Sequence, residues 1–189
     1  MALAACAAWL ALWSLTPGLR SDGVGSWFSA DSAAVLLIES GVAVVVVAAL
    51  LVTHDRVNRV LFAPSRQRWL YALPALLAVA LPFHASPSVP LPVYVAWMTI
   101  SVFWQDYLTF GLLQSYIRER LPAWATVAVV AGMFWLGHAV FLPDRFGPAH
   151  PVPSAAMIVL GAAFALLRER LGTLHLMLAL HLAFYFVAV

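Results

Sequence analysis

The sequence predicts an all-α fold, a polytopic transmembrane bundle of six to seven helices in a single membrane-embedded domain spanning residues 1–189. Hydrophobic residues make up 64% of the chain and charged residues only 10%, and the mean hydropathy is +0.94. A soluble domain is about 45–50% apolar and about 25% charged. This composition therefore excludes a soluble enzyme, a nucleic-acid-binding protein and a disordered regulator. The apolar runs are also continuous, whereas the strands of a membrane barrel alternate in polarity.

Seven apolar runs follow one another along the chain, separated by short polar or proline-rich segments. A helix that crosses the bilayer needs roughly 20 apolar residues, so the first, third and sixth runs are short for a crossing. The runs cover about residues 2–17, 33–52, 69–84, 92–116, 122–142, 154–167 and 172–189.

The arginines predict the orientation in the membrane. The chain has no lysine, and eight of its ten arginines lie in the loops 53–68, 117–121 and 168–171. By the positive-inside rule these loops and the N-terminus face the cytoplasm and the C-terminus faces outside. The Ala- and Arg-rich composition points to a bacterial inner membrane. The single cysteine, Cys6, excludes an intramolecular disulfide, and we expect the first run to be retained rather than cleaved.

Polar residues inside the apolar runs are the main functional signal, because such groups are expensive at membrane depth. Gln105 and Asp106 lie in the fourth run, His138 in the fifth, and His181 with Tyr185 one turn later in the seventh. We expect Asp106 to face the bundle interior or a water-filled cavity. Two interpretations are open: a hydrogen-bonded clasp between helices, or a polar site to which both histidines contribute.

We expect three further sets of residues to have structural roles. His175 lies about 240° from His181 around the helix, so we expect it near the cytoplasmic interface and away from the site. Glu39 is expected to line a cavity or pack against a neighbouring helix. Ala128 and Gly132, four residues apart, predict a close helix approach near His138.

The segment of about 100–189 resembles the CPBP family of intramembrane proteases, also called the CAAX-protease or Abi family. The family pattern is Glu-Glu-x-x-x-Arg, then Phe-x-x-x-His on the next helix, then His-x-x-x-Asn near the C-terminus. Phe134–His138 matches the second motif and His181 the start of the third. Four positions depart from the pattern, where this chain has Gln105, Asp106, Phe110 and Tyr185.

The resemblance implies an endopeptidase that hydrolyses a membrane-associated protein or leader peptide. It assigns water activation and oxyanion binding to positions 105, 106, 138, 181 and 185. An amide cannot act as a base, so we expect Asp106 to replace Gln105 as the general base, alone or with a histidine. Tyr185 would donate its O–H to the oxyanion where the family asparagine donates an N–H. We expect no metal, although two histidines and a carboxylate can bind Zn²⁺. The expected partners are the substrate and the lipid bilayer, with no nucleic acid.

Other functions are open. A pseudoprotease would retain the bundle and bind a membrane peptide without cutting it, which the loss of the family Glu, Arg and Asn favours. A proton or small-solute transporter would use Asp106, Glu39 and the histidines, but the chain has no internal repeat. A bis-histidine haem protein would use His138 and His181.

Overall fold

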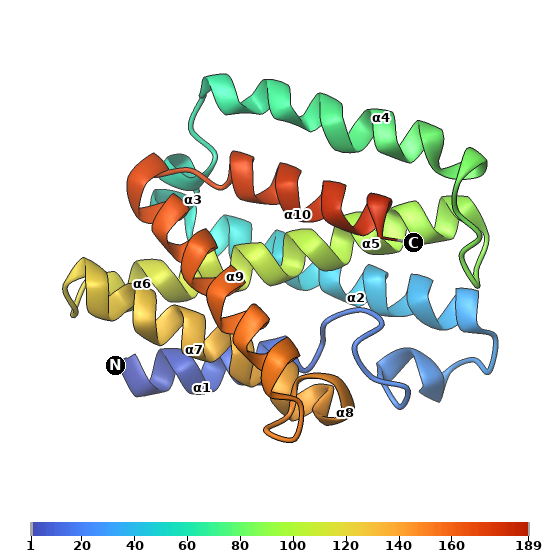
Figure 1. The fold of residues 1–189 in the computed structure, drawn as a ribbon, viewed down its shortest axis with the longest axis horizontal. Coiled ribbons are helices and arrows are strands. Elements are labelled where there is room, and N and C mark those ends of the chain that lie inside the picture. Colours follow the sequence, from blue (N-terminus) through green and yellow to red (C-terminus); the bar gives the residue numbers. More distant parts are fainter. Residues whose placement is uncertain (1, 189) are drawn as a thin grey trace.

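The structure is a computed structural model that describes residues 2–188, and within this range every regular element is helical and there is no strand. The elements, in chain order, are α1 (Ala2–Trp13), η1 (Val24–Trp27), α2 (Ser32–Thr53), α3 (Asp55–Leu61), η2 (Arg66–Tyr71), α4 (Ala72–Ala80), η3 (Leu81–Phe83), α5 (Leu91–Asp106), η4 (Tyr107–Leu113), α6 (Gln114–Arg118), α7 (Ala123–Phe141), α8 (Pro143–Phe146), α9 (Pro151–Leu171) and α10 (His175–Val187). The predicted all-α class is confirmed (Figure 1).

Three helices are long and apolar enough to cross a bilayer, namely α2, α7 and α9. The chain is accordingly a helical membrane protein. Each of the seven predicted runs contains a helix, but the helices in the first, third and seventh runs are shorter than a full crossing requires. By length and composition, the described residues thus give three candidate spans rather than six or seven.

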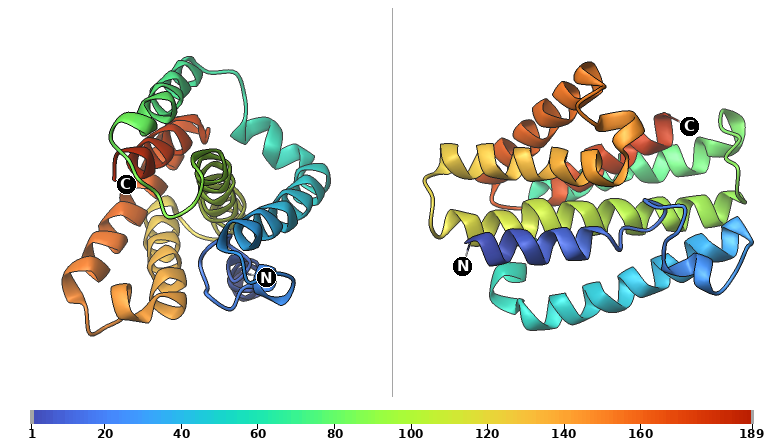
Figure 2. Two further views of the ribbon diagram at one scale, coloured as in Figure 1. Left: turned by 90° about the vertical axis from the view of Figure 1, so that its right-hand side faces the viewer. Right: turned by 90° about the horizontal axis from the view of Figure 1, so that it is seen from below.

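A continuous helical run from Leu91 to Arg118, composed of α5, η4 and α6, forms the axis of the bundle. The other helices surround it, as the end-on view in Figure 2 shows. Between residues 101 and 114 every side chain except Phe103 is buried. The buried polar residues of this segment, among them Asp106 and Thr109, are thus covered by the other helices, and the segment is the core of the molecule.

The middle of this run, η4, is a π-helix of seven residues that begins directly after Asp106. A π-helix bonds each N–H to the carbonyl five residues earlier, and such segments are rare and frequently occur at functional sites. All seven residues of η4 are buried. The change of helical period re-aims the side chains that follow Asp106.

Close approach between helices depends on two glycines of the fifth and sixth runs. A methyl group on Gly137 would come within 2.6 Å of the Trp13 ring of α1, and one on Gly161 within 3.2 Å of the Ala131 Cα atom of α7. The expectation for Ala128 and Gly132 is wrong, because Ala128 is exposed and a methyl group on Gly132 would meet nothing within 4 Å. These two positions are small but lie on an open face of α7.

The arginine-bearing segments meet at one end of the bundle. Arg118 donates to Glu169 at 3.2 Å, which ties α6 to the end of α9. The backbone N–H of Leu174 donates to the carbonyl of Leu61 at 3.0 Å, which ties the turn before α10 to α3. The N-terminus of the chain lies at this end and the C-terminus at the opposite end (Figure 1).

Candidate active site

A buried aspartate–histidine pair joins the central helix to the last helix. Asp106 is the final residue of α5 and is fully buried, and His181 of α10 is 5% exposed. The His181 Nδ1 atom lies 2.8 Å from the Asp106 Oδ1 atom. The predicted meeting of an acidic side chain with an imidazole from another helix is therefore present.

The chemistry of this pair determines where its proton lies. A carboxylate only accepts hydrogen bonds, so we assign the hydrogen to His181 Nδ1, which donates it to Asp106. In a neutral imidazole, the Nε2 atom of His181 is then the nitrogen left to accept a proton. The second carboxylate oxygen, Asp106 Oδ2, is buried and has no hydrogen-bond partner within the described protein.

His138 of α7 is also buried, and its ring is oriented by the backbone. Its Nδ1 atom lies 2.8 Å from the Phe134 carbonyl oxygen one turn earlier. Since a carbonyl only accepts, Nδ1 carries the hydrogen and Nε2 is the free nitrogen of the neutral ring. The ring packs against Trp13, Phe134 and Phe146, with the Trp13 centroid 5.5 Å away. His138 makes no hydrogen bond to Asp106 or His181 among the described residues, so only one of the two predicted histidines bonds to the carboxylate.

Tyr185 lies beside His181 on the same helix. The two ring centroids are 5.3 Å apart, and the Tyr185 side chain is half-buried. Tyr185 is thus the residue that brings an O–H group next to the aspartate–histidine pair.

Gln105 is buried, but its side-chain nitrogen bonds elsewhere. Its Nε2 atom donates to the Ser101 hydroxyl at 3.2 Å, and Ser101 in turn donates to the Pro17 carbonyl at 3.3 Å. The Gln105 Oε1 atom is buried without a described partner. The Ser101 hydroxyl therefore tethers α5 to the loop after α1, whereas the Gln105 amide bonds within its own helix. No hydrogen bond links Gln105 to Asp106 or His181 among those of the described residues.

Three phenylalanines connect the two histidines. Phe110 of η4 contacts Phe134 of α7 at a centroid distance of 5.3 Å and Phe164 of α9 at 5.5 Å. Phe134 stacks edge-on with His138, and Phe164 does the same with His181. Phe110 thus makes the centre of the site apolar and tightly packed.

The described residues contain no group of three or more His, Cys, Asp or Glu side chains arranged to hold a metal ion. Asp106 Oδ1 and His181 Nδ1, two of the ligand atoms that the sequence offered for zinc, are already bonded to each other. His181 would therefore offer only its Nε2 atom to a metal.

The remaining polar residues of the predicted spans lie apart from the pair. Glu39 accepts from the backbone N–H of Gly18 at 2.7 Å, which is a structural contact between α2 and the loop after α1. His175 is 5% exposed and lies between the Tyr71 hydroxyl at 3.1 Å and the Ala63 carbonyl at 3.0 Å. It is separate from His181, as expected, but it is buried in a polar cluster.

Several residues of the site carried no signal in the sequence. Trp13, which packs on His138, and Phe164, which packs on His181, are apolar residues within apolar runs. Trp9 donates to Thr109 of η4 at 3.0 Å, a contact between residues one hundred positions apart. Only Thr109, a polar residue one turn after Asp106, is distinctive in the sequence pattern.

No family model, no curated protein and no solved structure matches this chain. The geometry and chemistry of the site are therefore the basis for assigning a function.

Proposed function

We propose that this protein is an intramembrane endopeptidase that hydrolyses a peptide bond of a membrane-associated protein or leader peptide. The observation that carries the proposal is the 2.8 Å hydrogen bond between Asp106 and His181, with both side chains buried among apolar helices. A buried carboxylate costs several kcal/mol unless it is paired, so groups of this kind are retained for a specific purpose. The arrangement supports general-base chemistry.

In this mechanism His181 activates the attacking water. Its Nε2 atom takes a proton from the water molecule while the water oxygen forms a bond to the scissile carbonyl carbon. Asp106 holds the ring in the correct tautomer through Nδ1 and stabilises the imidazolium that forms, the role a carboxylate plays beside a catalytic histidine in other hydrolases. The carbon–nitrogen bond then breaks, and the proton passes from His181 to the leaving amine.

His138 and Tyr185 supply the second half of the site. The Tyr185 O–H next to His181 donates to the oxyanion that develops on the carbonyl oxygen. His138, with Nδ1 bonded to the Phe134 carbonyl, presents a bare Nε2 that accepts a hydrogen bond and so orients the attacking water, while the proton of the leaving amine comes from His181 alone. Gln105 is a positioning residue that donates to the Ser101 hydroxyl within α5. No step requires a metal.

The resemblance to the CPBP family supports the proposal at the two histidines and at Phe134. The departures at positions 105, 106, 110 and 185 separate this site from the family pattern. Here the working carboxylate is the second residue of the first motif, one methylene shorter than glutamate, and it acts through His181.

The test is cleavage in proteoliposomes that contain the full chain and a set of fluorescent peptides with one transmembrane segment. We expect Asp106→Asn, His138→Ala and His181→Ala each to lower the cleavage rate by about 10²–10⁴-fold, the usual contribution of general acid–base catalysis. His150→Ala is the matched control, because His150 is exposed and remote from the site. Equal turnover by wild type and all of these variants excludes the peptidase.

A second function is favoured by the packing around Phe110. This side chain is fully buried between Phe134 and Phe164, where the family has an arginine. A pseudoprotease would keep this packed apolar centre as a scaffold and bind a membrane peptide elsewhere on the bundle without cutting it. Retention of the fluorescent peptides by the wild type, with no cleavage product even in Gln105→Glu, would select this function over the first.

We also propose the membrane topology. The helices α1, α2, α4, α7, α9 and α10 together with the central run make seven crossings, with the arginine end of the bundle in the cytoplasm of a bacterial cell and the C-terminus outside. The position of the termini at opposite ends of the bundle supports an odd number of crossings. Accessibility labelling of single cysteines placed at Arg59 and Arg145 tests this topology, since only the latter should react from outside.

A further inference from the structure

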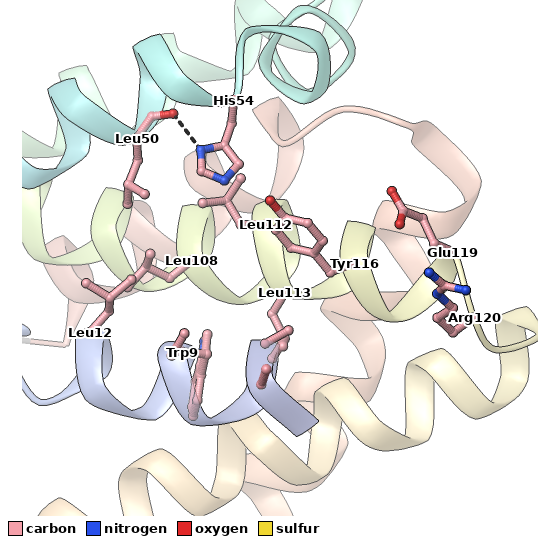
Figure 3. A pocket seen from close by; sticks show the side chains of 13 residues that line it. Trp9, Leu12, Leu50, His54, Leu108, Leu112, Leu113, Tyr116, Glu119 and Arg120 are labelled. Carbon is pink, nitrogen blue, oxygen red and sulfur yellow. Dashed lines mark hydrogen bonds between the residues drawn. The ribbon is translucent and has the colours of Figure 1, made fainter. Parts of the chain in front are cut away.

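A cavity of about 370 Å³ lies between α1, α2 and the central helical run, away from the aspartate–histidine pair (Figure 3). Its walls are apolar and come from all three elements: Ala8 and Leu12 of α1, Leu50 of α2, and Leu108 and Leu112 of η4. The volume is in the range of small-molecule sites, which are typically about 300–1,000 Å³ and mostly apolar.

One end of the cavity is polar. His54, Tyr116, Glu119 and Arg120 line this end and form the mouth of the cavity. The His54 Nδ1 atom lies 3.1 Å from the Leu50 carbonyl, so the ring is fixed by its own helix and turns its other edge toward Tyr116. Figure 3 shows the His54 and Tyr116 side chains next to each other, with Glu119 and Arg120 further along the same edge.

The surroundings of the cavity indicate which kind of molecule binds in it. The wall helix α2 has the highest mean hydropathy of the three candidate spans, and only 17% of its membrane-spanning window is buried, so its sides face hydrocarbon. The mouth lies at the arginine end of the bundle, where the ends of α2 and α6 come together. An apolar cavity at a membrane interface, with a polar mouth that carries one arginine and one glutamate, matches an acyl chain whose headgroup stays at the interface.

We propose that this cavity binds one acyl chain of a bilayer phospholipid, with the headgroup phosphate at the mouth beside Tyr116 and Arg120. The acyl chain contacts Leu108 and Leu112, which belong to the π-helical segment directly after Asp106. Occupancy therefore stabilises η4 against the rest of the bundle. The inference is independent of the proposed peptidase activity, because it concerns a different cavity and is measured as binding.

The test is native mass spectrometry of the delipidated full chain in detergent, titrated with palmitoyl-oleoyl-phosphatidylglycerol and, separately, with oleate. Ala8→Phe fills the cavity from α1, and Leu50→Trp fills it from α2. Ala7→Phe is the matched control, since Ala7 is an exposed neighbour of Ala8 and does not line the cavity. Thermal unfolding with and without the phospholipid gives a second readout.

We expect the wild type and Ala7→Phe to retain a single phospholipid and to melt at a higher temperature with it. Both filling variants should bind it at least about tenfold more weakly, because an added ring takes the space of several buried methylenes. Equal retention by all four proteins would overturn the proposal. So would oleate binding as tightly as the phospholipid, because the phosphate would then make no contribution at the mouth.

Discussion

Replacing Asp106 by asparagine separates a catalytic pair from a structural clasp. Asparagine has the same shape, and its Oδ1 atom still accepts the hydrogen of His181 Nδ1 in place of the carboxylate oxygen at 2.8 Å. The substitution therefore removes the negative charge and keeps the hydrogen bond. The Asp106 and His181 side chains are both buried, so water does not compensate for the lost negative charge.

The expected loss of stability is small. A hydrogen bond to a charged group contributes about 1.5–3 kcal/mol and a neutral one about 0.5–1.5 kcal/mol, so Asp106→Asn should lower the free energy of unfolding by about 1–1.5 kcal/mol. Asp106→Ala leaves the buried imidazole without its partner and should cost about 3–5 kcal/mol. Denaturant titration in mild detergent measures both values.

The expected loss of activity is much larger. Without the carboxylate, the imidazolium of His181 is not stabilised, and cleavage should fall by about 10²–10⁴-fold, which corresponds to about 2.7–5.5 kcal/mol of barrier. Asp144→Asn, at an exposed position, should leave cleavage and stability unchanged. If Asp106→Asn cleaves the peptides at the wild-type rate, the pair is only a clasp and the proposed mechanism fails.

Three further predictions concern packing and capping, and each is checked by the free energy of unfolding in detergent. Gly137→Ala should destabilise the protein by about 1–3 kcal/mol, because the added methyl group clashes with the Trp13 ring. Gly132→Ala, on the open face of the same helix, should cause no loss. An equal loss of stability in both variants would refute this packing. Phe110→Ala should lower the free energy of unfolding by about 3–5 kcal/mol, because it removes a buried ring from the aromatic centre. Phe83→Ala is the control and should cause no loss, because this side chain is 88% exposed. Asp31→Ala should cost about 1 kcal/mol, because the Asp31 side chain caps α2 by accepting from the Ala34 N–H at 2.8 Å; an unchanged stability would mean that the cap contributes nothing.

The helices could be predicted because their causes are local. The run that contains α2 forms a helix of 22 residues with a hydrogen-bonding cap before it, and Pro122 precedes α7, where its missing N–H costs nothing. The number of membrane crossings could not be predicted in this way. The helices α1 and α10 have only 12 and 13 residues, so whether they cross the membrane depends on the helices around them.

The candidate site could be predicted only in part. The meeting of Asp106 with His181 followed from the cost of a carboxylate in an apolar run, which leaves few arrangements besides a buried partner. The π-helical segment η4 could not be predicted, because its mostly apolar sequence fits an α-helix and a π-helix equally well. The bond of Ser101 to the Pro17 carbonyl could not be predicted, because it depends on the loop after α1, whose path is set by tertiary packing.

The protonation state of His181 inside the bilayer decides whether this residue can act as the general base. Nitrogen-15 NMR of histidine-labelled protein in lipid, with His181 assigned by comparison with His181→Ala, reports which ring nitrogen carries the hydrogen. We predict a hydrogen on Nδ1, bonded to Asp106, and a bare Nε2 at neutral pH. A hydrogen on Nε2 with Nδ1 bare is incompatible with the mechanism, because the free nitrogen would then face Asp106 and Nε2 could not accept the proton of the attacking water.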